Sequence, residues 1–161
     1  MKYFRNVLDA DQCESLIKML PGLPEKVETG SGKIIDRLHI SPQWNYNFYR
    51  LGREEVLDII KIVEAKISAD IVSFRIMHYP AGASIGAHVD SWHPVDGPSD
   101  CGMTIQLNNP KNYVGGEMLM NHTVTDLDQC DGISYTYDEP HEVKKIRFGE
   151  RWIASLRAKL R

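Results

Sequence analysis

The side chains best suited to chemistry lie in the segment His88-Val89-Asp90. On a β-strand, residues two apart point to the same face, so the imidazole of His88 and the carboxylate of Asp90 lie side by side. His141 begins a later segment with the character of a strand. Two histidines and one carboxylate on neighbouring strands can form a facial triad that leaves three coordination positions of Fe(II) open. Taken alone, a His-x-Asp motif is more often a salt bridge or a surface pair.

Arg151 follows His141 by ten residues and adds a second chemical group to this region. If Gly149 turns the chain, the strand that starts at His141 and the strand that starts at Arg151 form a hairpin, which brings the arginine back near the histidine. A guanidinium group there can hold a carboxylate through two hydrogen bonds. Ser155 shares the strand face of Arg151 and can add a hydroxyl contact. The alternative is that Arg151 is a solvated hairpin residue.

The elements that must position these residues change in character near residue 70. From there on, short segments of strand-like character are separated by Gly, Pro, Asn or Asp, and this spacing is typical of a β-sandwich or jelly roll. There is no room for the helical crossovers of a parallel sheet. The predicted strands are residues 71–79, 85–91, 102–108, 116–122, 133–138, 141–147 and 151–160, with 123–127 as a weaker candidate.

The residues before 70 predict helices that support this β region. Asp9 and Gln12 form a capping-box pattern, and the helix that they begin ends at Pro21. A second amphipathic helix is expected to start near Gly52, and residues 33–50 have room for one or two short strands. Two such helices need a sheet to cover.

Length and composition indicate one globular domain over residues 1–161, with a helical support region at 1–69 and a β core at 70–161. With 19 basic and 22 acidic residues, the net charge of −3 supplies no general basic field, so a nucleic-acid partner is not expected. No secretory signal or membrane-length apolar run is seen. The three cysteines form no CxxC pair, and we expect a reducing, cytoplasmic location. The oligomeric state stays open.

Several segments occur together in a familiar order. They are NVLDADQCESLIKML (6–20), FRIMHYPAGASIGAHVD (74–90), MTIQLNNP (103–110), YVGGEMLM (113–120) and HEV (141–143) followed by Arg151. Together they resemble the Fe(II)/2-oxoglutarate-dependent dioxygenase superfamily, and within it the prolyl 4-hydroxylase-like branch. The resemblance covers residues 70–160 well and the first helix loosely.

The resemblance implies a role for each matching residue. His88, Asp90 and His141 would bind Fe(II), and Arg151 would pair with the C5 carboxylate of 2-oxoglutarate. Tyr79 matches the tyrosine that hydrogen-bonds this cosubstrate, and O₂ would be the second cosubstrate.

The chain departs from the family's pattern in two places. One is the compact segment between residues 122 and 141, which would leave a reduced wall on the substrate side, and the other is a residue of the pocket. Gln106 stands where several hydroxylases of this branch carry a tyrosine before Leu-Asn. Gln106 can still donate to a carboxylate, as can Thr104 on the same strand face, and Ser155 completes the expected cosubstrate contacts. Trp92 and His93 follow the His-x-Asp motif and are candidate substrate contacts at the entrance, although Trp92 could simply cover the barrel.

The implied fold is mainly β with N-terminal helices, a double-stranded β-helix of the jelly-roll, cupin-like type. The implied reaction is hydroxylation of a C–H bond, on a prolyl or other protein side chain or on a small molecule, with succinate and CO₂ as coproducts. Two other interpretations stay open: a cupin-like metal-binding isomerase, and a non-catalytic β-sandwich binding module. A nucleic-acid demethylase would need a basic stripe that the composition does not indicate.

Overall fold

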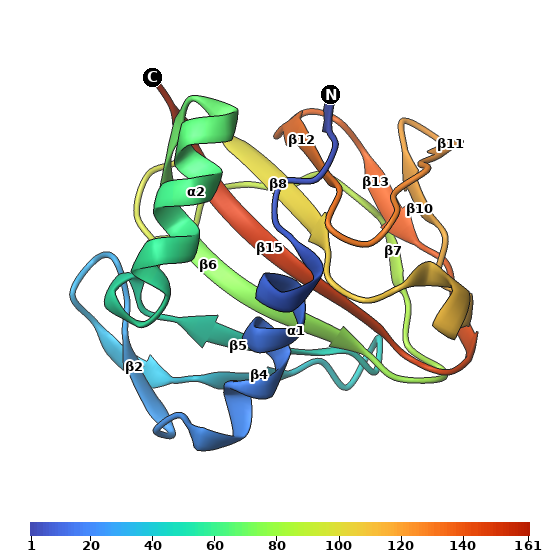
Figure 1. Ribbon diagram of the computed structural model, residues 1–161, viewed down its shortest axis with the longest axis horizontal. Coiled ribbons are helices and arrows are strands. Elements are labelled where there is room, and N and C mark those ends of the chain that lie inside the picture. The colour runs from blue at the N-terminus through green and yellow to red at the C-terminus, as the bar shows by residue number, and fades with distance from the viewer.

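The computed structural model describes residues 1–161 and is built on two antiparallel sheets that face each other (Figure 1). The main sheet has the order β1 (Lys2–Phe4), β12 (Gly132–Thr136), β8 (Cys101–Gln106), β15 (Arg151–Leu160), β6 (Ala69–Tyr79), β5 (Asn47–Leu51) and β4 (Leu38–Ile40). The second sheet has the order β11 (Thr123–Val124), β10 (Met118–Met120), β13 (His141–Val143) and β7 (Ile85–His88). Two short pairs join β14 (Ile146–Phe148) to β9 (Val114–Gly115) and β2 (Lys26–Glu28) to β3 (Ile34–Asp36).

Two α-helices, α1 (Ala10–Lys18) and α2 (Leu57–Ile67), accompany the sheets. The predicted capping box of α1 is present, because the Gln12 N–H donates to Asp9 Oδ1 and the Asp9 N–H donates to Gln12 Oε1. Short 3₁₀ helices are η1 (Leu20–Gly22), η2 (Arg53–Val56), which leads into α2, and η3 (Pro110–Asn112). Neither α-helix has the length and apolar character needed to cross a membrane.

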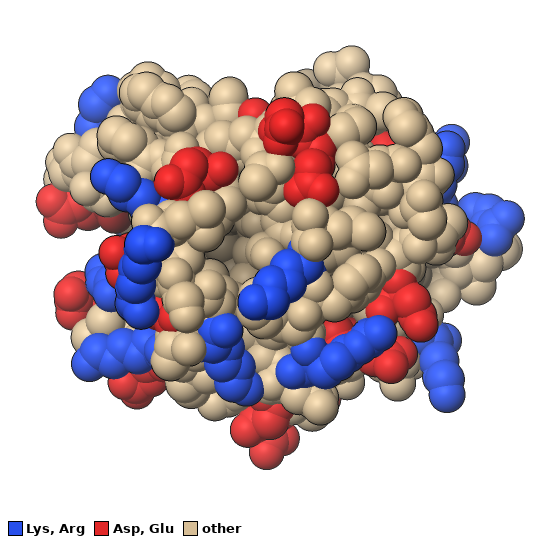
Figure 2. All heavy atoms as spheres, turned by 90° about the horizontal axis from the view of Figure 1, so that it is seen from above, with Lys and Arg blue, Asp and Glu red and all other residues tan.

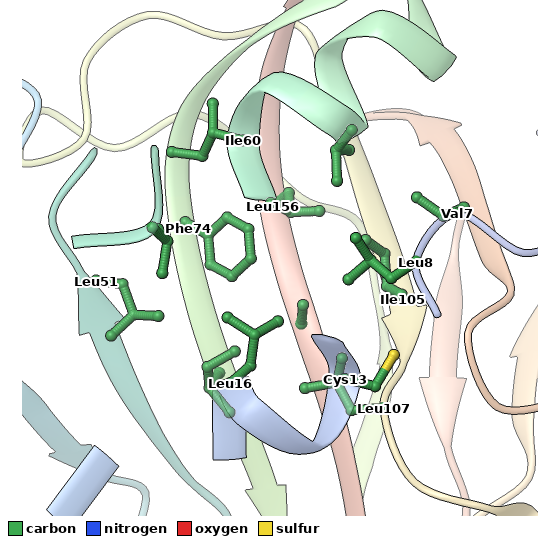
Figure 3. Packing of buried hydrophobic residues seen from close by; sticks show 14 of the residues in the cluster. Val7, Leu8, Cys13, Leu16, Leu51, Ile60, Phe74, Ile105, Leu107 and Leu156 are labelled. Atoms are coloured by element: carbon green, nitrogen blue, oxygen red, sulfur yellow. The ribbon is translucent and has the colours of Figure 1, made fainter. Parts of the chain in front are cut away.

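The helices cover one face of the main sheet, where they bury the larger apolar cluster (Figure 3). Leu16 of α1 and Ile60 of α2 pack there with Phe74 of β6 and Leu156 of β15. Alternate residues of the same strands belong to a different cluster, because side chains along a strand alternate between its two faces. The two inner strands β6 and β15 therefore separate a helix-covered face from a face that carries the site.

The second apolar cluster lies between the two sheets. Met77 of β6 and Ile153 of β15 contribute from the main sheet, and Met118 and Val143 contribute from the second sheet. In the short β9–β14 pair, Gly115 has φ +86°, and a Cβ on it would lie 2.2 Å from the Lys145 carbonyl oxygen. Only glycine allows this close approach of β9 to β14.

The predicted fold class, mainly β with N-terminal helices, is confirmed, and so are both helices. The predicted hairpin is wrong. The 141–147 segment divides into β13 and β14, which pair with β7, β10 and β9, whereas β15 pairs with β6 and β8. Because both edges of β15 are occupied by long strands, the strand before Gly149 has no edge of β15 to join.

The first 69 residues contain more β structure than the sequence pattern indicates. Three strands begin within residues 33–50 rather than one or two, and β1, β4 and β5 extend the main sheet. Strands of three residues are too short for alternation to be recognised. The three cysteines are free and buried, and the Sγ atoms of Cys13 and Cys130 lie 3.6 Å apart.

Candidate metal centre

Pairing of β7 with β13 brings the two predicted histidines together. His88 and His141 are register partners, and their ring centroids lie 4.3 Å apart. Asp90, two residues beyond His88, places Oδ1 3.5 Å from His88 Nε2 and Oδ2 3.4 Å from His141 Nε2. One ligand atom from each of the three side chains lies within 4.8 Å of the others. Two imidazole nitrogens and one carboxylate converging in this way suit a divalent transition metal.

The other ring nitrogen of each histidine is held by a backbone carbonyl. His88 Nδ1 lies 2.7 Å from the Gly86 oxygen, and His141 Nδ1 lies 3.1 Å from the Glu139 oxygen. An Nδ1–H that donates to a carbonyl leaves the lone pair on Nε2, the atom that faces Asp90. Both rings are therefore oriented as metal ligands without help from a second side chain.

The environment of Asp90 keeps it ionised. Burial alone would raise the pKa of Asp90, but the adjacent imidazoles of His141 and His88 and the charge of Arg157 hold it well below its usual range. Arg157 Nη1 lies 3.0 Å from Asp90 Oδ2. The same carboxylate raises the pKa of His88. Sequence reasoning missed Arg157, although its position two residues after Ser155 places it on the predicted face of the strand.

A cavity of about 240 Å³ opens between the two sheets at this triad. Arg151, only 2% exposed, lines it from β15. Its Nε donates to Gln106 Oε1 at 3.2 Å, and its guanidinium lies over the Tyr79 ring at 5.5 Å. Arg151 Nη1 is buried with no hydrogen-bond partner. Burial raises the pKa of Tyr79, so the phenol keeps its proton and can donate.

The structure brings most of the predicted site residues into this one cavity. The lining includes all three triad residues and four of the five residues predicted to contact the cosubstrate, namely His88, Asp90, His141, Tyr79, Thr104, Arg151 and Ser155. Arg151 reaches it because β15 lies opposite the second sheet, and not through the predicted hairpin.

Three predicted residues lie outside the cavity lining. Gln106 accepts from Arg151, and its Nε2 donates to the Asn108 oxygen at 2.9 Å and to Tyr113 Oη at 3.1 Å. It therefore positions the arginine instead of facing the pocket. Trp92 is 49% exposed, and His93 Nδ1 accepts from the Val95 N–H within the same loop.

A larger cleft of about 580 Å³ lies beside α2 and β2. Its basic side chains are already paired with acids, for example Arg37 with Glu55 at 2.7 Å and Arg53 with Glu64 at 3.0 Å. No group of potential metal ligands converges there. The smaller cavity is thus the better candidate for chemistry, because its polar groups converge without partners.

The surface around the molecule carries charges of both signs. Figure 2 shows Lys and Arg side chains and Asp and Glu side chains on the same face, around a hollow in the surface. This mixture agrees with the small net charge of −3.

The curated sequences that match this chain are PKHD-type hydroxylases. No protein-family model matches the chain. A stretch of 92 residues, 52% of the chain, is 35% identical to a PKHD-type hydroxylase of Prochlorococcus marinus (strain MIT 9515). Over 94% of the chain, the identity to a PKHD-type hydroxylase of Psychrobacter sp. (strain PRwf-1) is 26%, and the match covers 68% of that relative. For most of the curated relatives, including the first, the chain spans about two fifths of their length.

Solved structures share the architecture at low sequence identity. A Pseudomonas putida prolyl-4-hydroxylase matches with a TM-score of 0.67 and 14% identity, over 99% of this chain and 92% of that one. The chain has the double-stranded β-helix fold of the 2-oxoglutarate oxygenases. The resemblance to the prolyl 4-hydroxylase-like branch is therefore confirmed.

Two further structures of this fold were solved with bound molecules. A collagen prolyl hydroxylase of Paramecium bursaria Chlorella virus-1, in its 2OG complex, has a TM-score of 0.63 and 16% identity, over 99% of this chain and 96% of that one. A Trichoplax adhaerens prolyl hydroxylase in complex with a hypoxia-inducible-factor peptide has a TM-score of 0.66 and 15% identity, over 98% and 82%.

Proposed function

We propose that this chain is an Fe(II)- and 2-oxoglutarate-dependent dioxygenase that hydroxylates a C–H bond of its substrate. The observation that carries the proposal is the pairing, in one cavity, of the His88–Asp90–His141 cluster with the buried, unpartnered Nη1 of Arg151. Buried polar atoms without partners are rare in folded proteins and point to a missing ligand. A metal at the triad and a dicarboxylate at Arg151 would satisfy these groups together.

The donor set fits the implied metal. His88, Asp90 and His141 would hold Fe(II), and Arg151 with Tyr79, Thr104 and Ser155 would hold 2-oxoglutarate. When bound, this pair would use O₂ to convert a substrate C–H to C–OH, while 2-oxoglutarate becomes succinate and CO₂. The chain itself orients both imidazoles through backbone carbonyls, keeps Asp90 ionised and supplies a cavity between the two sheets.

The comparisons do not identify the substrate of this chain, so its class is part of the proposal. A peptide bound to one structural neighbour supports a peptidyl or other protein side chain as the first candidate, and a small molecule is the second. Nucleic acid is the least favoured partner, given the net charge of −3. Three free, buried cysteines support the proposed cytoplasmic location, where disulfides are rare.

The test is an anaerobic titration of the protein with Fe(II) and 2-oxoglutarate, followed by optical absorption. We expect the metal-to-ligand charge-transfer band of the chelated cosubstrate in the wild type, no band in His88→Ala and a weaker band in Arg151→Ala. Arg147→Ala, an exposed arginine on β14, is the control and should retain the full band. Metal binding without the band would favour the cupin-like isomerase, and absence of metal binding would favour the non-catalytic module.

A further inference from the structure

Four of the six buried side-chain polar atoms that lack hydrogen-bond partners belong to residues that line the candidate cavity. Asp90 Oδ2 and Arg151 Nη1 are accounted for by the metal and the cosubstrate of the proposed function. Arg75 Nε and Arg157 Nη1 are not. Arg157 Nη1 lies close to Asp90 Oδ2 but without hydrogen-bond geometry. Two buried guanidinium donors thus stay without a ligand after the metal and cosubstrate are assigned.

The strand register places these two arginines together and away from Arg151. Arg75 is the partner of Ser155 across β6 and β15, and Arg157 is the partner of Ser73. Because alternate residues share a face, Arg75, Arg157 and Ser73 point to the same side of the main sheet as the triad. The hydroxyl of Ser73 is also buried and unpartnered. A small cluster of donors therefore lies further along β15 from the proposed cosubstrate arginine, beginning at the level of Ser155.

Arg75 is the member of this cluster that has no acidic partner. Its neighbour across β5, Arg50, forms an ion pair with Asp96 at 2.5 Å. The Arg75 guanidinium instead lies over the Phe48 ring at 5.1 Å. Burial, together with the nearby charge of Arg157, lowers the pKa of Arg75 to about 10, so the group is still charged at neutral pH. An uncompensated charge in a buried place is costly unless a ligand pairs with it.

We propose that Arg75, assisted by Arg157, binds an anionic oxygen group of the substrate, a carboxylate or a phosphate. The inference rests on the proposed function and narrows its substrate class. Guanidinium groups are suited to such oxyanions because they can donate two parallel hydrogen bonds. Since Arg157 also touches Asp90, an anion bound there would lie beside the metal, where the substrate must present its C–H bond.

The test observes Arg75 directly, with small ions that do not depend on the rest of the substrate. Protein labelled with ¹⁵N is loaded with Zn(II), which has no redox chemistry and so permits no turnover, and with 2-oxoglutarate. The Nε–H resonance of Arg75 is assigned from its absence in Arg75→Lys. Acetate and inorganic phosphate are titrated separately, with acetamide as the neutral counterpart of acetate.

We expect the Arg75 resonance to shift saturably with acetate or phosphate and not with acetamide. A lower dissociation constant for acetate would identify a carboxylate group, and a lower one for phosphate would identify a phosphate group. Arg75→Gln should weaken binding of the preferred ion by about tenfold or more, the range for one charge-assisted hydrogen bond. Arg147→Gln, the exposed control, should bind it as the wild type does.

Two kinds of failure are distinguishable. If calorimetry shows that the protein binds neither Zn(II) nor 2-oxoglutarate, the proposed function is refuted, and so is this inference, which rests on it. If both bind, but the Arg75 resonance responds no more to the anions than to acetamide, the anion site is overturned and the proposed function stands. Equal anion affinity in wild type and Arg75→Gln would overturn it as well.

Discussion

Replacing Arg151 with methionine should separate ligand binding from folding. In the free protein, Arg151 contacts no acid: its Nε donates to Gln106, and its Nη2 lies 4.0 Å from Met118 Sδ. The side chain is 2% exposed, so the folded protein buries a cation without a counter-ion. Methionine, an apolar side chain of similar length, removes the free-energy cost of burying this unpaired charge. We therefore expect the free energy of unfolding of the ligand-free variant to stay equal to that of the wild type or to rise.

Arg151→Met should bind 2-oxoglutarate much more weakly than the wild type does. Removing one partner of a buried, hydrogen-bonded charge pair costs about 2 to 5 kcal/mol. This range corresponds to a rise in dissociation constant from about 30-fold to several thousand-fold. The measurement is calorimetric titration of Zn(II)-loaded protein with 2-oxoglutarate, for the wild type, Arg151→Met and the exposed control Arg147→Met.

Thermal or urea unfolding provides an independent readout of the same change. At a cosubstrate concentration of about 100 times its dissociation constant, the wild type should gain about 2.7 kcal/mol of stability. If the affinity of Arg151→Met is about 100-fold weaker, the same concentration should stabilise it by only about 0.4 kcal/mol. A variant that binds 2-oxoglutarate within threefold of the wild type would refute the assignment of Arg151. So would a variant whose ligand-free form loses stability.

Three further changes test the packing and the positioning of the site. Gln106→Leu should weaken 2-oxoglutarate binding by about fivefold, because Arg151 loses the acceptor for its Nε; calorimetry showing unchanged affinity would contradict this role. Leu156→Ala should lower the free energy of unfolding by about 2 to 5 kcal/mol in urea titration, since this side chain is fully buried under the helices, while metal affinity stays the same. Burial alone would raise the pKa of Glu64, but its bonds with Arg53 and the Ile71 N–H lower it. Ionised Glu64 therefore stabilises the fold at pH values above its ordinary pKa, and this contribution is lost as the pH falls through the lowered pKa. Urea unfolding should therefore show Glu64→Gln about 1 to 3 kcal/mol less stable than the wild type at neutral pH and closer to it in acid; a pH-independent difference would contradict this account.

Two of the three proposed metal ligands were predictable because their spacing is local. His88 and Asp90 are two residues apart, and a strand needs nothing else to align them. Arg151 was predicted through its motif, but by the wrong route, since the hairpin that was to carry it does not form. Its true position depends on β15 lying between β6 and β8, which are pairings over long sequence distances that a local pattern does not encode.

The arginines beyond the motif show what else sequence reasoning could not supply. Arg75 and Arg157 have the strand spacing of inward-facing residues, but many inward-facing arginines are simply paired, as Arg50 is with Asp96. Their significance depends on which acids lie nearby in three dimensions. Likewise, the role of Gln106 as a partner of Arg151, and not of the cosubstrate, follows from side-chain packing between two strands.

One strand therefore positions two of the site's arginines, Arg151 and Arg157. Arg151, Ser155 and Arg157 all lie on the inner face of β15, and six residues of strand separate the two arginines by about 20 Å along the backbone. A register slip of one residue would turn all three toward the helices, so the long pairing with β6 and β8 is what fixes them. This separation gives a physical reason for two arginine sites in one small cavity. A dicarboxylate bound at one end would leave the other end free, so an anionic substrate and the anionic cosubstrate would not compete for the same guanidinium group.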